Sequence, residues 1–481
     1  MPRLSYSFGR SAFAALVDGL APRANAGEMP RISMFRFIRA STGAERHEFL
    51  MNEYAKKGPL LQMHVLPPKL ILLLKLLPKT WSKKVLGYPR RMIFVASGDA
   101  MAELHKQTEN LERVYRSLGF AKTLGDSSIF MLDDNDQEQG PKWRDAHDRL
   151  APFFLRKENI KSMDHMMREE ALWAVSVYGK SPSVRKLADL TSAAIIHRML
   201  FGLRIAVEDF ERLEYLAERV WLGQIPLGKA HSAYRLEFEA MMARLQPGIT
   251  PDSICSQLKN SAADLGAEWH MNQMVGLFFA GQETTRMMLA FALYELVIHP
   301  EYQTVFTSDD LPALRTAFLR EVLRVHPPVA WLPRTNKAKM TLQGYAISAG
   351  SSLQIDVQSM HELRANWGEE SHHFQPERFL APLKKPAAYC PFGFGRRICI
   401  GQHMAMFESE AILGEWLKTF AIEKLDEKLP ELDYARSGVP SMVAAFKLKF
   451  SPRLSAQSRQ GRGPSAPLPR NTESPAATAD A

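Results

Sequence analysis

The chain contains little cysteine and no uncharged run long enough to span a membrane. Its 481 residues include only three cysteines, Cys255, Cys390 and Cys399. Three are too few for a disulfide framework, which fits a reducing compartment. No stretch reaches the ~18 uncharged residues that a membrane-spanning helix needs. Residues 11–22 are apolar and lie just before a small-residue triplet that resembles a signal-cleavage site, but Asp18 interrupts them, so we expect no signal peptide.

Internal linkers and repeats are missing as well. No Pro/Ser-rich linker occurs before residue 451, and no repeat has a solenoid or propeller period. A chain of this length suggests about three domains of ~150 residues each, but one large, mainly helical unit is the simpler interpretation. We therefore expect a poorly structured segment at 1–30, one domain at 31–450, and a disordered tail at 451–481 that is rich in Ser, Pro, Arg, Gly and Ala.

The charge is positive but not concentrated. Lys and Arg number 61 against 52 Asp and Glu, a net charge of +9. The sequence has no arginine-rich block and no basic run interleaved with aromatic residues, so nucleic acid is not an expected partner. An acidic protein or an anionic membrane surface suits this charge better.

Periodicity and breakers predict mostly helices. Residues 267–298 form a long apolar run without proline until Pro300, too long for a strand, and we expect a central buried helix there. Two or more helices are expected between 158 and 245. Other predicted helices cover 43–57, 143–154, 314–325 and 402–420, and short strands are predicted at 59–65, 91–96, 340–347 and 353–357.

An unusually apolar segment at 66–81 lies between the first two predicted strands. Leu70 to Leu77 carries only Lys75 as a polar interruption. Prolines bound the segment, so a helix there would have about two and a half turns, far short of a span. Two interpretations stay open: the segment is extra core, or it dips into a membrane surface with its lysines at the head groups.

The strongest local signal is a glycine-rich loop that carries one cysteine to the start of a helix. It reads Phe392-Gly393-Phe394-Gly395-Arg396-Arg397-Ile398-Cys399-Ile400-Gly401. Glycines let the backbone turn tightly and approach a flat cofactor. The helix N-terminus and the nearby Arg397 favour thiolate over thiol at Cys399. A buried structural cysteine is the alternative for any lone cysteine, and it is the one we favour for Cys255 and Cys390.

This loop resembles the Phe-x-x-Gly-x-Arg-x-Cys-x-Gly signature of the cytochromes P-450. The resemblance implies that the Cys399 thiolate binds the iron of haem b, with Phe392, Gly393, Arg397 and Gly401 as cofactor contacts. It also implies the fold class: mainly α with small β-sheets, a single-domain cytochrome P-450 fold with haem between the long central helix and the helix after the cysteine loop.

The central helix contains Ala280-Gly281-Gln282-Glu283-Thr284-Thr285. An acid and a hydroxyl inside an apolar helix carry a desolvation cost. A structural explanation is a threonine bonded back to its own helix and a glutamate reaching solvent. The family has Ala-Gly-x-Asp/Glu-Thr at this place. The resemblance gives Thr284 a hydrogen bond to oxygen at the iron and Glu283 a role in feeding protons through water, while Ala280 and Gly281 leave room for oxygen.

Further motifs follow in family order. Glu321 and Arg324 share a helix face at i, i+3, and the resemblance implies that both join Arg378 in a structural ion network. The resemblance also implies haem-propionate contacts from Trp143, His147, Arg334 and Arg397. Trp143 and His147 lie on one helix face, but an ordinary surface histidine remains an alternative for His147.

Loops on the distal side of the haem are expected to select the substrate. They are mostly apolar and aromatic, which favours an apolar substrate. By position they are 115–130, 221–234, Phe278–Phe279, 329–331 and 441–443.

The resemblance, which spans 43–450, implies a monooxygenase that activates O2 and hydroxylates or epoxidises an apolar substrate, fatty-acid-like or terpenoid-like. The sequence has no flavin or ferredoxin module, so we expect electrons from a ferredoxin or flavodoxin with its reductase, received on a basic face. That face would include Lys142, Arg144, Arg149 and Arg396. A peroxide-driven or isomerising relative, or a thiolate-haem sensor or electron carrier, is the alternative. The expected location is cytoplasmic, and contact of 66–81 with a membrane surface would make the protein peripheral to the membrane.

Overall fold

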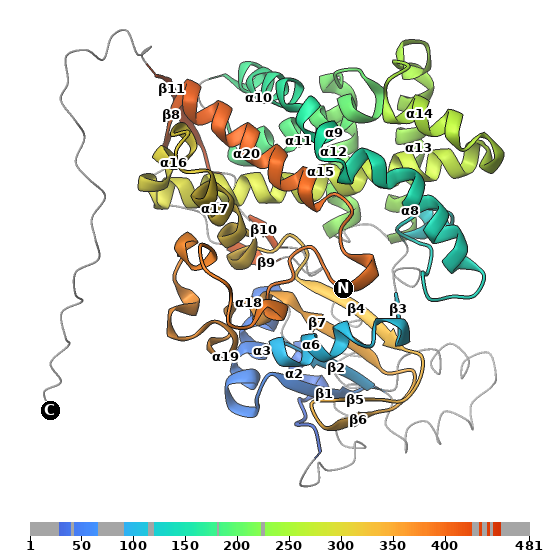
Figure 1. The fold of residues 1–481 in the computed structure, drawn as a ribbon, viewed down its shortest axis with the longest axis vertical. Coiled ribbons are helices and arrows are strands. Elements are labelled where there is room, and N and C mark those ends of the chain that lie inside the picture. The colour runs from blue at the N-terminus through green and yellow to red at the C-terminus, as the bar shows by residue number, and fades with distance from the viewer. Residues whose placement is uncertain are drawn as a thin grey trace, which may run out of the picture.

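The computed structural model describes most of the chain. The described residues are 28–39, 43–65, 91–113, 120–179, 182–222, 227–425, 432–434, 440–442 and 446–453. Within them the protein is mainly helical with small sheets, so the predicted fold class is confirmed. Figure 1 shows a large helical part around the long helix α15 and a smaller part built on a sheet. The apolar segment at 66–81 and most of the two expected disordered ends lie outside the described residues. Ser451 and Pro452, which we expected in the tail, instead end a strand that pairs with residues 420–424, and Met29 is buried.

The helices in the N-terminal half are α2 (Met34–Arg39), α3 (Gly43–Lys57), α6 (Gly98–His105), α7 (Ala121–Leu124), α8 (Gln139–Leu155), α9 (Lys157–Ser162), α10 (Asp164–Tyr178), α11 (Val184–Phe201) and α12 (Val207–Leu222). Those that follow are α13 (Leu227–Leu245), α14 (Ile254–Ser261), α15 (Gly266–Ile298), α16 (Gln303–Thr307), α17 (Pro312–Val325), α18 (Val357–Glu362), α19 (Arg364–Trp367) and α20 (Gln402–Thr419).

The main sheet has five strands in the order β1-β2-β7-β4-β3. These are β1 (Leu60–His64), β2 (Arg91–Val95), β7 (Ser352–Asp356), β4 (Trp331–Asn336) and β3 (Leu111–Arg113). Only the β2–β7 pair is parallel; the other neighbours in this sheet run antiparallel. Three two-stranded sheets pair β5 (Met340–Leu342) with β6 (Tyr345–Ile347), β8 (Phe420–Lys424) with β11 (Leu448–Pro452), and β9 (Leu432–Tyr434) with β10 (Pro440–Met442). Segments far apart in sequence therefore meet in the main sheet, and a buried apolar cluster lies against it.

Helix α15 is the centre of the helical part. Its 33 residues rise 1.5 Å each, so the helix is about 50 Å long. It packs chiefly against α11, and both helices are buried along most of their length. The close approach depends on Gly281, because a Cβ there would lie 2.9 Å from the side chain of Ile196 on α11.

Helix α8 starts earlier than the sequence predicts. We expected a helix over 143–154, but α8 begins at Gln139 and includes Pro141 in its first turn. Proline is tolerated in the first turn of a helix, where its missing N–H would have no partner in any case. The longer helix carries Trp143 on its buried face.

Within the described ranges, no helix combines the length and apolar character that crossing a membrane would require.

Candidate active site

The cysteine loop leaves Cys399 exposed. The backbone N–H of Cys399 donates to Phe392 O at 2.9 Å, and that of Gly393 donates to Cys390 O at 3.0 Å, so two hydrogen bonds close the loop. Gly393 and Gly395 adopt φ of 82° and 66°, which L-residues rarely do. Gly401 lies next to the thiol, since a Cβ there would lie 3.8 Å from Cys399 Sγ.

The other two cysteines have a different environment. Cys255 and Cys390 are buried, whereas Cys399 is exposed. Burial raises the pKa of the Cys255 thiol to about 11 and that of the Cys390 thiol to about 12. Both therefore stay protonated and poor as metal ligands near neutral pH, and Cys399 remains the one suited to bind a metal.

On α15, one short face is open while its surroundings are buried. Thr284 is exposed and Ala280, one turn earlier, is partly exposed. In this structure the Thr284 hydroxyl donates to Ala280 O at 2.7 Å, the back-bonded arrangement that sequence reasoning left as an alternative. The small side chain of Ala280 and the hydroxyl of Thr284 thus border one opening.

Two of the neighbouring residues do not face that opening. The position that a Gly281 side chain would take is occupied by Ile196, so the glycine serves the packing of α11 on α15. Glu283 does not reach solvent as the structural explanation supposed. It is buried, and its Oε2 accepts a hydrogen bond of 2.7 Å from Arg286 Nη2.

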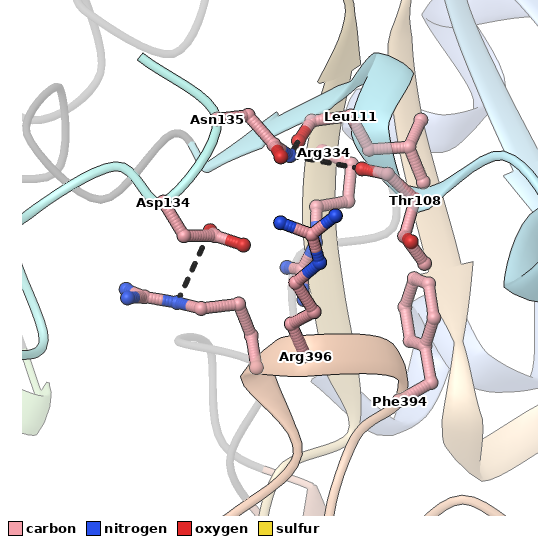
Figure 2. A pocket seen from close by; sticks show the side chains of 8 residues that line it. Thr108, Leu111, Asp134, Asn135, Arg334, Phe394 and Arg396 are labelled. Atoms are coloured by element: carbon pink, nitrogen blue, oxygen red, sulfur yellow. Dashed lines mark hydrogen bonds and ion pairs between the residues drawn. The ribbon is translucent and has the colours of Figure 1, made fainter. Parts of the chain in front are cut away.

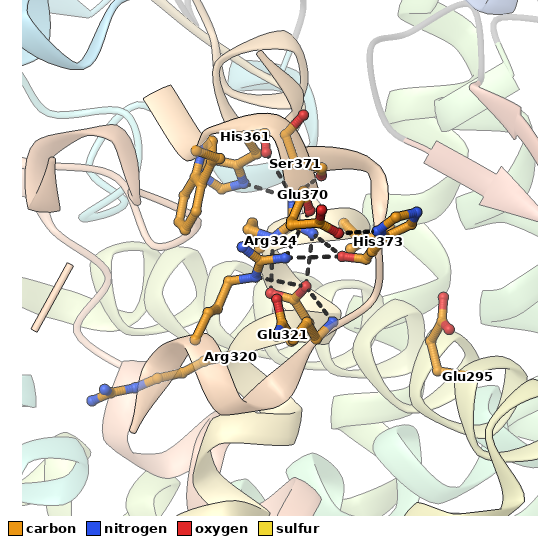
Figure 3. Close-up of polar contacts among 12 residues, drawn as sticks. Glu295, Arg320, Glu321, Arg324, His361, Glu370, Ser371 and His373 are labelled. Carbon is orange, nitrogen blue, oxygen red and sulfur yellow. Dashed lines mark hydrogen bonds and ion pairs between the residues drawn. The ribbon is translucent and has the colours of Figure 1, made fainter. Parts of the chain in front are cut away.

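A buried ion network joins α17 to the chain around Ser371 and His373 (Figure 3). Arg324 Nε and Nη2 donate to the two carboxylate oxygens of Glu321 at 2.8 and 2.7 Å. Arg378, in the 3₁₀ turn Pro376–Phe379, donates from Nε to Glu321 Oε1 at 3.1 Å. The remaining donors of Arg324 bind the backbone oxygens of His361, Ser371 and His373. The network that the resemblance implied is therefore present.

His361 connects this network to the cysteine loop. The backbone N–H of Cys390 can only donate, and it lies 3.2 Å from His361 Nε2. Nε2 therefore accepts, and Nδ1 carries the proton that is donated to Arg324 O at 3.0 Å. Burial, aided by the charge of Arg324, lowers the pKa of His361 to about 3 and keeps the ring neutral. Sequence reasoning missed His361, since no local pattern marks it.

Three arginines surround a small pocket beside the loop (Figure 2). Arg397 Nη2 donates to the backbone oxygens of Ile129 and Leu132, and its guanidinium lies 4.8 Å from the ring of Trp143. Arg334 stacks on Phe394 at 5.1 Å. The residues that line the pocket are Thr108, Leu111, Asp134, Asn135, Arg334, Phe394, Arg396 and Arg397.

Arginines outnumber acids among the described residues that line the pocket. Asp134 Oδ1 lies 3.5 Å from Arg397 Nε, and Glu109, outside the lining, pairs with Arg396 at 2.6 Å. Guanidinium groups that line a pocket attract the carboxylates of a ligand.

His147 lies apart from this pocket. Its ring centroid is 5.1 Å from that of Trp143, and its Nδ1 lies 3.2 Å from Asp148 Oδ1. His147 does not line the arginine pocket, so its contact with a propionate stays a prediction.

The expected substrate-selecting segments are only partly described. Residues 115–119, 223–226 and 443 lie outside the described residues. Phe278 is fully buried and packs on Phe238 with ring centroids 5.5 Å apart, so it belongs to the core. Phe279 contacts Tyr234 and Phe120, which join α13 and the segment before α7 to α15.

The residues present fit haem. An exposed thiol precedes α20, glycines hold its loop open to a flat group, and an arginine-lined pocket lies beside the loop. A thiolate and paired arginines are the donors that a haem iron and its propionates require.

Comparison with known proteins agrees with this site. The family model described as Cytochrome P450 matches residues 250–450. The chain is 33% identical over 205 residues to Cytochrome P450 734A5 of Oryza sativa subsp. japonica, covering 38% of this chain and 35% of that protein. Over residues 250–450 the chain thus matches the cytochrome P450 superfamily that the cysteine loop resembles. It is also 32% identical over 218 residues to Steroid 21-hydroxylase of Sus scrofa, covering 40% of this chain and 42% of that protein.

A longer match is with Bifunctional cytochrome P450/NADPH--P450 reductase 2 of Bacillus subtilis (strain 168). The two sequences are 26% identical over 381 residues, and the match covers 69% of this chain and 36% of that protein. The chain spans about a third of the length of the curated relatives it matches. Cytochromes P450 hold haem b, so the predicted cofactor is confirmed at the level of the superfamily.

Removing Arg324 should strongly lower the free energy of unfolding. Arg324→Ala leaves the Glu321 carboxylate buried without its main partner, and we expect a loss of about 3–5 kcal/mol in the free energy of unfolding. The control Arg315→Ala removes a more exposed pair with Glu410 and should cost about 1 kcal/mol. Urea denaturation measures both, and equal losses would contradict the special role of the network.

His361 should make the fold sensitive to acid. Because its pKa is lowered in the folded chain, below pH 6.5 the unfolded chain binds a proton that the folded chain does not. The stability due to this histidine is thus complete above pH 6.5 and lost as the pH falls toward 3, by up to ~1.4 kcal/mol per pH unit. His361→Phe should be less stable than the parent at pH 7, and denaturation curves should show the difference shrinking with acid. A difference that stays constant from pH 7 to pH 4 would contradict this prediction.

Proposed function

We propose that this chain is a cytochrome P450 monooxygenase that activates O2 and inserts one oxygen atom into an apolar substrate. The observation that carries the proposal is that Cys399 is exposed and lies in a closed glycine loop before α20. The other two cysteines are buried, and burial raises the pKa of their thiols. When bound, haem supplies the redox chemistry of oxygen. The residues of the chain bind this cofactor, orient the substrate and supply protons.

In this proposal Cys399 binds the iron as a thiolate. Its backbone oxygen accepts from Gln402 N at 3.4 Å in the first turn of α20, so the sulfur lies near the positive end of that helix. Arg334 and Arg397 hold the propionates in the pocket where both are found, with Trp143 stacked on Arg397. The cofactor contacts assigned to Phe392, Gly393, Gly401 and His147 complete the set.

Thr284 and Glu283 handle protons in this proposal. The Thr284 hydroxyl has to rotate away from Ala280 O before it can donate to dioxygen in the opening beside it. Glu283 supplies protons from the interior side of α15, where it is paired with Arg286. Ala280 leaves room for oxygen at the opening, whereas Gly281 lets α15 pack closely on α11.

The proposed substrate is apolar, fatty-acid-like or terpenoid-like. The contacts of Phe279 with Phe120 and Tyr234 give this region an aromatic character. Steroid 21-hydroxylase, one of the relatives, bears a name that refers to an apolar polycyclic compound. Both observations favour recognition by apolar contact.

The proposed electron donor is a separate acidic protein, a ferredoxin or flavodoxin. Lys142 and Arg144 on α8 and Arg396 in the cysteine loop are exposed. Arg149 is less available, because it is half-buried and paired with Asp145. We propose a cytoplasmic location; the membrane contact at 66–81 lies outside the described residues.

Replacement of the ligand tests the proposal directly. The reduced parent protein with carbon monoxide should absorb near the wavelength from which the family takes its name, because a thiolate binds the iron. Cys399→Ala should lose that band, whereas the control Cys255→Ala should keep it. A band that survives in Cys399→Ala would assign the ligand elsewhere.

Loss of the Thr284 hydroxyl should uncouple the reaction. Thr284→Ala should still bind haem and substrate, yet release hydrogen peroxide in place of product, because no hydroxyl orders the proton supply at the opening. Thr284→Ser keeps a hydroxyl and should retain most of the coupling. Product and peroxide formed per reductant consumed provide the measurement, and equal coupling in the parent and both variants would refute the role.

A further inference from the structure

A buried ion cluster joins α15 to α11 next to the proposed active site. Arg286 on α15 contacts two acids at once: its Nη2 donates to Glu283 Oε2 at 2.7 Å, and its Nε lies 2.8 Å from Asp189 Oδ1 on α11. Asp189 and Glu283 are only 3% and 8% exposed as side chains. One guanidinium group therefore holds the carboxyl groups of two helices together in a site of low exposure.

Acids outnumber cations among the described groups of the cluster. Besides Arg286, a cation near Asp189 is Arg185 on α11, whose Nε lies 3.5 Å from Asp189 Oδ2 and whose side chain is 32% exposed. Glu214 on α12 acts on both Asp189 and Arg286 with a further negative charge. Tyr178 on α10 interacts with Asp189, and Tyr234 on α13 interacts with Glu283.

Asp189 is the acid that keeps a proton in this cluster. Burial raises its pKa to about 8; Glu214 and Glu283 act in the same direction, while the charges of Arg286 and Arg185 oppose them. Its Oδ2 accepts no hydrogen bond from any residue that the structure describes. A carboxyl group whose oxygen lacks such donors gains little from ionising. Two acids close to one cation are a general arrangement in which one acid stays protonated near neutral pH.

The cluster leads from solvent to the open face of α15. Arg185 is partly exposed at one end, and Asp189 and Arg286 follow in the interior. Glu283 at the other end directly precedes Thr284, the exposed residue of that face. The contacts thus run from the solvent side at Arg185 to Glu283, which is the neighbour of Thr284 in the chain.

We propose that Asp189 is the proton reservoir for Glu283 and that Arg286 is a positioning residue that keeps the two carboxyl groups together. The inference rests on the proposed monooxygenase function. When Glu283 has given up its proton, the O–H bond of Asp189 breaks and an O–H bond forms on the Glu283 carboxylate. A proton from solvent, entering on the Arg185 side, then restores the acid form of Asp189. No electron moves, and Arg286 keeps its charge throughout.

The first measurement needs no turnover. Infrared difference spectra of the full-length, haem-loaded ferric protein should show a protonated carboxyl band that disappears as the pH rises through about 8. Asp189→Asn should remove the Asp189 part of this band, while the part due to the buried Glu408, whose pKa burial also raises to about 8, should stay. Arg286→Lys, which keeps a cation, should shift the midpoint of the Asp189 part without removing it. A carboxyl band that is missing, or unchanged in Asp189→Asn, would overturn the proposal even if a variant lost activity through misfolding.

The second measurement is the pH profile of coupling, the product formed per reductant consumed. The parent should lose coupling as the pH rises through about 8. Asp189→Asn should be uncoupled by about tenfold at pH 7 and show no further loss at higher pH, because the reservoir is gone. Asp189→Glu, which keeps a carboxyl group, should restore most of the coupling.

A matched control separates this role from the loss of an ion pair. Arg315→Gln breaks a pair of 2.7 Å with Glu410 on other helices and should leave both the band and the pH profile unchanged. A parent protein that makes no product and lacks the carbon monoxide band would refute the proposed function while the infrared titration still reported on Asp189. A coupled parent whose pH profile is the same in Asp189→Asn would refute the relay alone.

Discussion

The buried guanidinium of Arg324 is the constraint on which the geometry of the site depends. A charge with almost no exposure is costly to bury unless a counter-ion and hydrogen-bond acceptors replace the lost water. Glu321 provides the counter-ion, and backbone oxygens provide the rest. Those oxygens belong to the chain between α18 and the turn that holds Arg378, so the arginine fixes a stretch with little regular structure. His361 continues this order to Cys390, where the cysteine loop begins.

Two sides of helix α15 have different environments. One side packs so closely on α11 that Gly281 has no room for a side chain. Another side carries Ala280 and Thr284, which lie one turn apart; Ala280 is partly exposed and Thr284 is exposed. Glu283 lies between these two sides and pairs inward with Arg286, so the acid is tied to the interior cluster. A rigid helix in van der Waals contact with its neighbour can place a hydroxyl and an acid on different sides with little freedom, because packed interiors are close to crystal density.

Arginine recurs wherever the site requires a fixed charge. Arg324 binds a carboxylate and three backbone oxygens, Arg397 binds two backbone oxygens beneath Trp143, and Arg286 holds two acids. The planar guanidinium offers several donors in fixed directions and stays charged when buried, which lysine does not do reliably. This explains why one residue type serves the fold, the cofactor pocket and the interior cluster.

Local pattern by itself determined the long helices and distinguished Cys399 from the other two cysteines. The apolar run at 267–298 and the helix over 314–325 were predictable because their periodicity and their prolines act over a few residues. The glycine loop marked Cys399, and the i, i+3 spacing marked Glu321 and Arg324, for the same reason. The family signature added Arg378, which no spacing rule could have paired with them.

Tertiary structure decided which groups meet when the partners are far apart in the chain. Asp189 reaches Arg286, and His361 reaches Cys390, only because separate helices and loops pack together. The same packing buried Glu283, which a local pattern could not distinguish from a solvated acid, and directed the missing side chain of Gly281 toward Ile196. Burial and charge pairing depend on neighbours in space, so the sequence supplied the reactive groups and the fold determined their ionisation and their partners.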